Sequence, residues 1–195
     1  MISDSNIKIN GFLKIYDPDT NEVFFEGKNA VHYENISVAL ANSISNKSAG
    51  LIHKMAFGNG GTSVDPTGII SYLTPNSSGS NAALYNQTYS KVVDDNSVEN
   101  LDPTRNFIEV RHVTGTNYSD IYVVCLLDYG EPSGQSAFDN NTNTNSTYVF
   151  DELGLTSLDP SGNSVLLTHV LFHPVQKSLN RLIQVEYTVR IQTLS

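Results

Sequence analysis

The chain has 195 residues, of which 39% are hydrophobic and only 16% are charged, and its net charge at pH 7 is −9. A chain of this length can bury one full core, and the Asn, Ser and Thr residues that carry most of its polarity favour strands joined by turns. Its 11 basic residues are scattered singly, whereas nucleic acids and anionic membranes bind clusters of Lys and Arg, so we expect neither as a partner.

The N-terminal part of the sequence predicts a β-hairpin followed by one helix. Apolar and polar residues alternate over 7–15, a DPDTN turn signal follows, and 22–27 forms the partner strand. Over 31–46 the apolar residues recur at spacings of three and four, which is typical of an amphipathic helix. We expect the apolar face of this helix to pack against a sheet or another subunit. It consists of Tyr33, Ile36, Leu40 and Ile44, and is widened by Val38, Ala39 and Ala41.

A strand predicted over 51–58 is followed by a long polar region, residues 58–106, with only weak strand signals. Loops of this length inside a compact domain are usually functional or make contacts elsewhere. We therefore expect an extended arm at about 58–106 that becomes ordered on a neighbouring subunit.

The C-terminal half predicts the remaining strands of the fold. They cover residues 107–113, 121–129, 148–155, 165–172 and 182–192, and a second polar loop covers 130–148. The strand at 121–129 is apolar on both faces and should be central, whereas the last strand alternates strictly and should have one wet face. Hairpin-like connections dominate, so we predict a mainly β fold: an antiparallel β-sandwich with one amphipathic helix and long loops, forming a single domain over residues 1–195.

The glycine-rich stretch AFGNGGTSVDPTG at 56–68 raises the possibility of a phosphate-binding loop. A Walker loop needs a lysine after its last glycine, and a dinucleotide loop needs a third glycine where Ser63 stands. Neither pattern is met, so Gly58, Gly60 and Gly61 are expected to permit positive φ or a close backbone approach. We interpret them as a hinge at the base of the 58–106 arm.

The titratable residues form no recognisable catalytic or metal-binding pattern. His169 and His173 share a strand face but lie about 13 Å apart, too far for one metal ion. The acidic pairs Asp94–Asp95 and Asp151–Glu152 are sequence neighbours, whose side chains point to opposite faces of a strand. Cys125 lies in an apolar run and should be a buried, inert thiol. We therefore expect no enzyme activity, no metal and no cofactor.

Four stretches resemble virion structural proteins of tailed bacteriophages, especially small proteins of myophages. They are GKNAVHYENISVALANSISN at 27–46, IHKMAFGNGGTSVDPTG at 52–68, TYVFDELGL at 147–155 and LLTHVLFHPVQKSLNRLIQVEYTVRI at 166–191. The Phe-x-Glu-φ-Gly-Leu motif, where φ is an apolar residue, is similar to modules of tail-fibre and baseplate proteins. The resemblance covers about half of the chain and none of its motifs is catalytic.

This resemblance implies a non-enzymatic virion structural protein, made and assembled in the host cytoplasm. Its partners would be other copies of itself and other virion structural proteins, with a place at the neck, tail or baseplate. The N-terminus lacks a signal-peptide pattern and no run reaches the ~18 to 20 apolar residues of a membrane span, which fits this expectation. The alternatives are a capsid decoration protein and a carbohydrate- or receptor-binding β-sandwich.

The residues expected at the protein interface all lie in the first polar region. Glycines and small polar residues let backbones approach closely, and tyrosines serve as amphipathic anchors in interfaces. The predicted interface residues are Asn59, Gly60, Gly61, Thr62, Val64, Pro66, Tyr85 and Tyr89.

Overall fold

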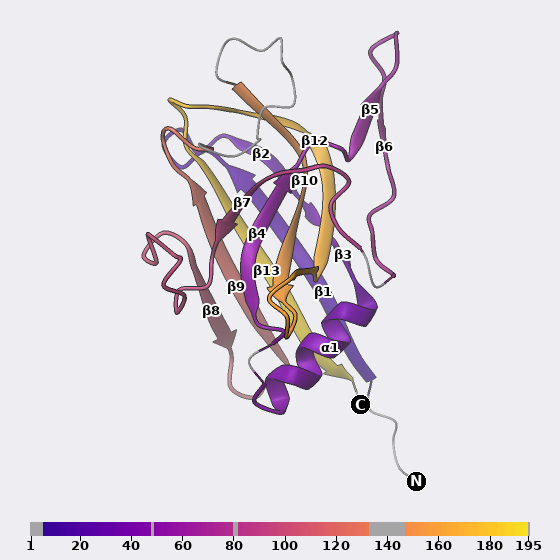
Figure 1. The fold of residues 1–195 in the computed structure, drawn as a ribbon, viewed down its shortest axis with the longest axis vertical. Coiled ribbons are helices and arrows are strands. Elements are labelled where there is room, and N and C mark those ends of the chain that lie inside the picture. Colours follow the sequence, from indigo (N-terminus) through magenta and orange to yellow (C-terminus); the bar gives the residue numbers. More distant parts are fainter. Residues whose placement is uncertain (1–5, 48, 80–81, 133–146, 195) are drawn as a thin grey trace.

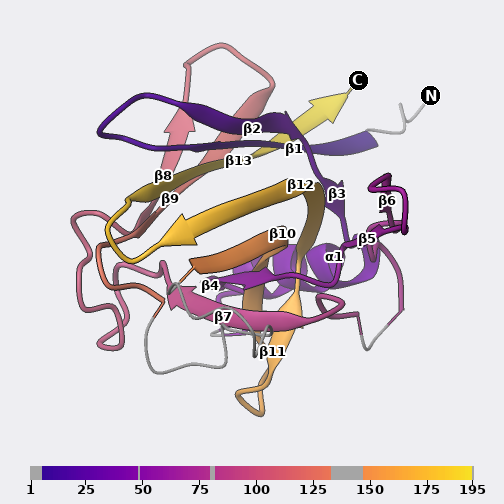
Figure 2. The same cartoon turned by 90° about the horizontal axis from the view of Figure 1, so that it is seen from above.

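Two antiparallel sheets pack face to face in the computed structural model, which describes residues 6–47, 49–79, 82–132 and 147–194 (Figures 1 and 2). The first sheet has the strand order β2 (Val23–Lys28), β1 (Asn6–Tyr16), β13 (Ile183–Leu194), β9 (Tyr118–Leu127) and β8 (Phe107–His112). The second has the order β3 (Ala30–Val31), β12 (Thr168–Ser178), β10 (Thr147–Leu158), β4 (Ile52–Gly58) and β7 (Gln87–Val92), with β11 (Ser164–Leu166) beside β10. The helix α1 spans Tyr33–Ile44. The predicted mainly β, antiparallel sandwich with one helix is thus confirmed.

The core lies between the two sheets and follows from the strict alternation of the central strands. β13 pairs with β1 on one side and with β9 on the other, without a break in either register. Its inward-facing residues, such as Val185 and Tyr187, are fully buried and pack with Leu153 and Phe172 of the second sheet. Each buried aliphatic side chain of this kind contributes about 1.5–3 kcal/mol to folding.

Several strands that the sequence pattern does not reveal complete the sheets. β3, β7 and β11 are short or polar, and their pairing with longer strands, not their own periodicity, makes them extended. The segment predicted as one strand at 165–172 is divided between β11 and β12, and β12 runs on to Ser178 through Pro174. Pro174 is tolerated because it lies in a bulge, where the register with β10 shifts and ladder hydrogen bonds are interrupted.

The region predicted as one extended arm at 58–106 is only partly extended away from the sandwich. Its segment β7 is an edge strand of the second sheet. A separate two-stranded hairpin, β5 (Thr62–Val64) and β6 (Ile70–Tyr72), projects at the end of the molecule far from α1 (Figure 1). Of the second predicted loop, 130–148, residues 133–146 lie outside the described part of the chain.

The helix α1 packs on the sandwich with only part of the predicted apolar face. Its buried residues are Asn35 and Ala39, and the Asn35 side-chain amide donates a hydrogen bond to the carbonyl of Leu166 at 2.7 Å. This anchor turns Tyr33 and Ile44 into solvent, whereas Ile36 and Leu40 are half-buried. Tyr33 and Ile44 therefore do not pack on the sheets, and their packing against another subunit, the other expected alternative, stays a prediction.

Candidate functional site

The glycine-rich loop at 58–62 ends β4 and lies against two acidic residues of β10, Asp151 and Glu152. Both carboxylates are buried among backbone N–H groups of this loop and of a second loop at 85–86. A bulge makes this possible, because the β10–β12 register shifts between Phe150 and Glu152 and the regular alternation of strand side chains is interrupted there. The two neighbouring acids, which strand alternation would place on opposite faces, therefore bind one and the same loop.

Glu152 is fully buried and accepts four hydrogen bonds. Its Oε1 accepts from the backbone N–H groups of Gly60 at 3.1 Å and Asn86 at 2.7 Å. Its Oε2 accepts from the backbone N–H of Tyr85 at 2.8 Å and faces His169 Nε2 at 3.0 Å. Burial raises the pKa of this carboxyl, but the bonds from His169 and from the three backbone N–H groups outweigh burial and hold the pKa below its usual value.

His169 is also fully buried, and its hydrogen bonds define its tautomer. The backbone N–H of Asn76 donates to Nδ1 at 2.9 Å, so Nδ1 is an acceptor. The ring proton therefore sits on Nε2 and is donated to Glu152. Both ring nitrogens are occupied, so this imidazole presents no free base to a substrate.

Asp151 binds the next part of the same loop. Its Oδ1 accepts from the backbone N–H of Gly61 and its Oδ2 from that of Thr62, both at 2.9 Å, and the Thr62 hydroxyl also donates to Oδ2. We call Asp151, Glu152 and His169 the carboxylate clasp. It joins three separate loops to β10 and β12, and it forms the base from which the β5–β6 hairpin leaves the sandwich.

The three glycines of the loop make room for the clasp and for the neighbouring loop. None of them has φ in the left-handed range. A Cβ on Gly58 would lie 2.4 Å from Glu152 Oε1, and a Cβ on Gly60 would lie 2.8 Å from the backbone nitrogen of Asn86. Of the two roles expected for these glycines, the structure shows close backbone approach and not positive φ, and their action as a hinge stays a prediction.

The β5–β6 hairpin is internally well ordered by its turn. Asp65 Oδ1 accepts from the backbone N–H groups of Thr67 at 2.8 Å and Ile69 at 3.0 Å, and Gly68 adopts φ +88. Val64 and Ile69 are 62% and 63% exposed, and Tyr72 and Leu73 are also exposed. The hairpin pairs only with itself among the described residues, so it presents apolar side chains on a preformed scaffold.

The predicted interface residues fall into four groups. Asn59, Gly60, Gly61 and Thr62 form the base of the hairpin at the clasp, whereas Val64 and Pro66 are exposed on the hairpin itself. Tyr85 is partly exposed and its hydroxyl donates to the carbonyl of Thr74 at 2.6 Å. Tyr89 is only 6% exposed and packs on Phe57 in the core, so its ring is not available to a partner and this part of the prediction is corrected.

Other reactive groups are buried or dispersed. Cys125 is fully buried, and burial raises the pKa of its thiol to about 12, as expected for an inert cysteine. In the described ranges, no three His, Cys, Asp or Glu side chains gather in a way that could hold a metal ion. Within the same part of the chain, no helix has the length and apolar character needed to cross a membrane.

Comparison with known proteins adds no family to this geometry. No protein-family model, no curated protein and no solved structure matches the chain. The functional interpretation therefore depends on the residues themselves.

Proposed function

We propose that this chain is a non-enzymatic structural subunit of a tailed-phage particle, at its neck, tail or baseplate, and that it docks onto its own copies and onto other virion proteins through the β5–β6 hairpin. The observation that carries the proposal is the exposed apolar tip of this hairpin, which stands away from the sandwich (Figure 1). The sequence resemblance to virion structural proteins is the reason for placing the chain in a phage particle.

Exposed apolar side chains gathered on one projecting element are typical of interaction sites. Val64, Ile69 and Tyr72 would each lose water contact on docking, and the buried area supplies most of the association energy. The hairpin also has a favourable shape for this role, because both of its edges are unpaired among the described residues and can accept a further strand.

The carboxylate clasp explains why this projecting hairpin is held in one orientation. Asp151 binds Gly61 and Thr62 at the base of β5, and the backbone N–H of Leu73 donates to the carbonyl of Gly61 at 3.0 Å where β6 leaves. A docking element that is already ordered loses less conformational entropy on binding. Asp151 and Glu152 therefore support binding by holding the hairpin in place, although they are buried and lie outside the proposed interface.

The double variant Val64→Asp, Ile69→Asp is expected to weaken self-association at least about tenfold, because each lost aliphatic contact contributes about 1.5–3 kcal/mol. Sedimentation velocity over a concentration series measures the association. The matched control is Val98→Asp, Leu101→Asp, which changes two almost fully exposed apolar residues of another loop. Both double variants should melt within a few degrees of the unchanged protein, since all four side chains are exposed.

A wild-type protein that stays strictly monomeric, and that also fails to bind isolated phage particles, would contradict the proposal. Equal weakening in the hairpin variant and in the control would show that the hairpin is not the interface. Locating the chain in a cryo-electron microscopy map of the virion tests its place in the particle.

Carbohydrate binding is a second candidate, and it has a specific observation in its favour. A hollow of about 370 Å³ on the outer face of the first sheet is lined by Phe12, Lys14, Glu186 and Tyr122, among others. Aromatic rings beside hydrogen-bonding side chains can hold a polar ligand with apolar faces. We expect that any specific signal on a glycan array is lost in Phe12→Ala and kept in the hairpin variant; a robust signal of this kind would place sugar binding above assembly.

A further inference from the structure

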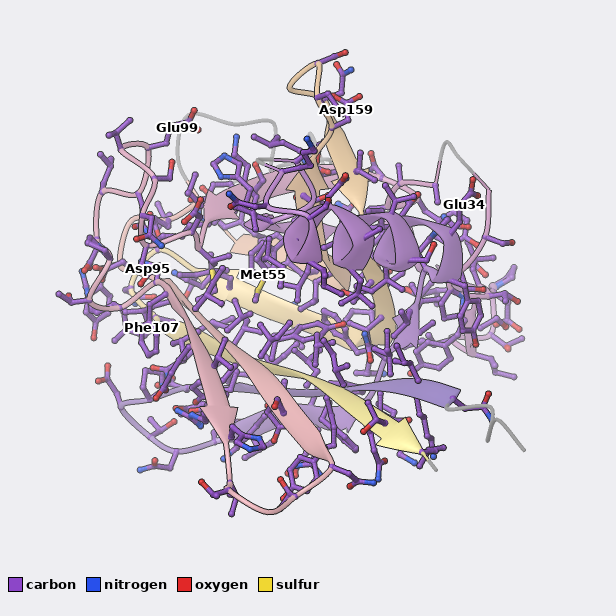
Figure 3. The ribbon with its side chains drawn as sticks, turned by 90° about the horizontal axis from the view of Figure 1, so that it is seen from below. Glu34, Met55, Asp95, Glu99, Phe107 and Asp159 are labelled. Atoms are coloured by element: carbon purple, nitrogen blue, oxygen red, sulfur yellow. The ribbon has the colours of Figure 1, made fainter. Side chains whose placement is uncertain are left out.

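An open cavity of about 290 Å³ lies between α1 and the two sheets, at the end of the molecule opposite the β5–β6 hairpin (Figure 1). Figure 3 looks at this end from below and shows α1 on one side, with β8, β9 and β13 on the other. Asp95 lies on the loop at one edge of this end of the molecule. Ala39, one of the two buried residues of α1, lines the cavity together with Ile36 and Leu40.

The walls of this cavity are mainly aliphatic. Five half-buried isoleucines line it, one each from α1, β4, β8, β9 and β13: Ile36, Ile52, Ile108, Ile121 and Ile191. Leu155 and Val189, which are fully buried, also line it. An apolar cavity of about 150 Å³ in a protein core is large enough to bind benzene, so this one can accept an aliphatic side chain.

The charged groups at the cavity are all acidic. Asp94 and Asp95 line it beside Asn96, and no Lys or Arg is among the described lining residues. Asp94 is already engaged, since it accepts a hydrogen bond from the backbone N–H of Asn96 at 3.0 Å and lies 3.8 Å from His53 Nδ1. Asp95 is exposed and makes no hydrogen bond or ion pair among the described residues, so the cavity favours an apolar group that carries positive charge nearby.

Two further observations identify what kind of molecule fits. Leu51 and Val110 line the cavity and yet are 52% and 70% exposed, which gives the opening a wide apolar rim that a small ligand inside would leave uncovered. A second copy of this chain is disfavoured at this cavity, because the turn of the apolar hairpin that it would insert carries Asp65. Like charges would then meet Asp94 and Asp95.

We propose that this cavity receives a segment of a different protein in which aliphatic side chains are flanked by Lys or Arg. The inference rests on the proposed function only in that the occupant is a protein component of the same assembly. It concerns the end of the molecule far from the hairpin, so the two interfaces can be tested separately in one sample.

The test is a titration of the full chain, labelled at the isoleucine δ1 methyl groups, with the peptide acetyl-Lys-Leu-Leu-Lys-amide. The methyl signals of Ile36, Ile52 and Ile121 should shift in a saturable way, whereas those of Ile69 and Ile70 on the hairpin should stay in place. The peptide acetyl-Glu-Leu-Leu-Glu-amide should bind at least about tenfold more weakly, as should the basic peptide to Asp95→Lys. Glu34→Lys, at the other end of α1 in Figure 3, is the control for the same change in net charge and should bind like the unchanged protein.

Absence of cavity shifts up to about 10 mM basic peptide would overturn the inference, because affinity weaker than millimolar is not specific recognition. Equal binding of the two peptides would overturn it as well. Binding of octylamine without binding of the basic peptide would indicate a small ligand and would also overturn the inference. Movement of the cavity signals on diluting the protein alone would indicate a second copy, with the same consequence. The hairpin variant would still report on self-association in each of these cases.

Discussion

Replacing Glu152 with Gln is expected to lower the free energy of unfolding by about 2–4 kcal/mol at pH 7, despite the nearly identical shape of the two side chains. Each carboxylate oxygen of Glu152 faces two donors, Gly60 and Asn86 at Oε1, and Tyr85 and His169 at Oε2. The amide NH₂ of Gln must face one of these pairs in either flip state. His169 cannot relieve the conflict by changing tautomer, because its Nδ1 accepts from Asn76.

Urea unfolding followed by circular dichroism measures this change, with Glu109→Gln as the control. Glu109 is exposed and its ion pair with Arg111 lies on the surface, so its loss should change stability by less than about 1 kcal/mol. A Glu152→Gln protein as stable as the control would show that the clasp does not anchor the loops.

The difference in stability between the wild type and Glu152→Gln should also depend on pH. The folded pKa of Glu152 is held below 4.5, the ordinary value of a Glu side chain, which applies in the unfolded chain. The stabilisation by its charged form is therefore complete above that value and is lost as the pH falls through the lower, folded pKa. The difference in stability between the wild type and Glu152→Gln should be constant from pH 7 to about 5 and should shrink below about pH 4.

Gly58→Ala is the second change with a large expected effect, a loss of about 2–3 kcal/mol in the free energy of unfolding. The added Cβ would lie 2.4 Å from Glu152 Oε1 and 2.5 Å from the backbone oxygen of Asn86. Neither neighbour can move freely, because the carboxylate is held by four hydrogen bonds and the carbonyl accepts from the backbone N–H of Asn59 at 3.1 Å. Thermal melting of the purified domain measures the loss.

The control for this glycine is Gly68→Asn, in the turn of the hairpin. Gly68 has φ +88, a conformation that Asn tolerates better than most residues, and nothing lies within 4 Å of its built Cβ. Gly68→Asn should therefore lower the free energy of unfolding by less than about 1 kcal/mol. If Gly58→Ala melts like Gly68→Asn while its oligomers are disrupted, the loop acts as a hinge after all, and the close-approach explanation is wrong.

The sequence by itself determined the fold class and the strands with the strongest patterns. The strict alternation of β13 required one buried and one wet face, and the apolar run of β9 required a central place in the sheet, because period-two burial is a local property of the chain. The burial of Cys125 followed from the same run. The sequence also showed that the glycine loop lacks the lysine of a Walker loop and the third glycine of a dinucleotide loop. Residue spacing alone therefore excluded the phosphate-binding interpretation.

Only the tertiary structure decided what the glycine loop and its acids do. Residues 58–62, 85–86 and 151–152 are far apart in the chain, and the hydrogen bonds among them exist because β4 pairs with β10 so that Gly58 lies opposite Glu152. The bulge beside Asp151 brings two neighbouring acids to one loop, against the alternation rule that the sequence pattern obeys elsewhere. An acidic pair within an apolar strand, together with a glycine-rich loop, was the signal available in the sequence. The geometry that joins them depends on long-range packing that no local pattern encodes.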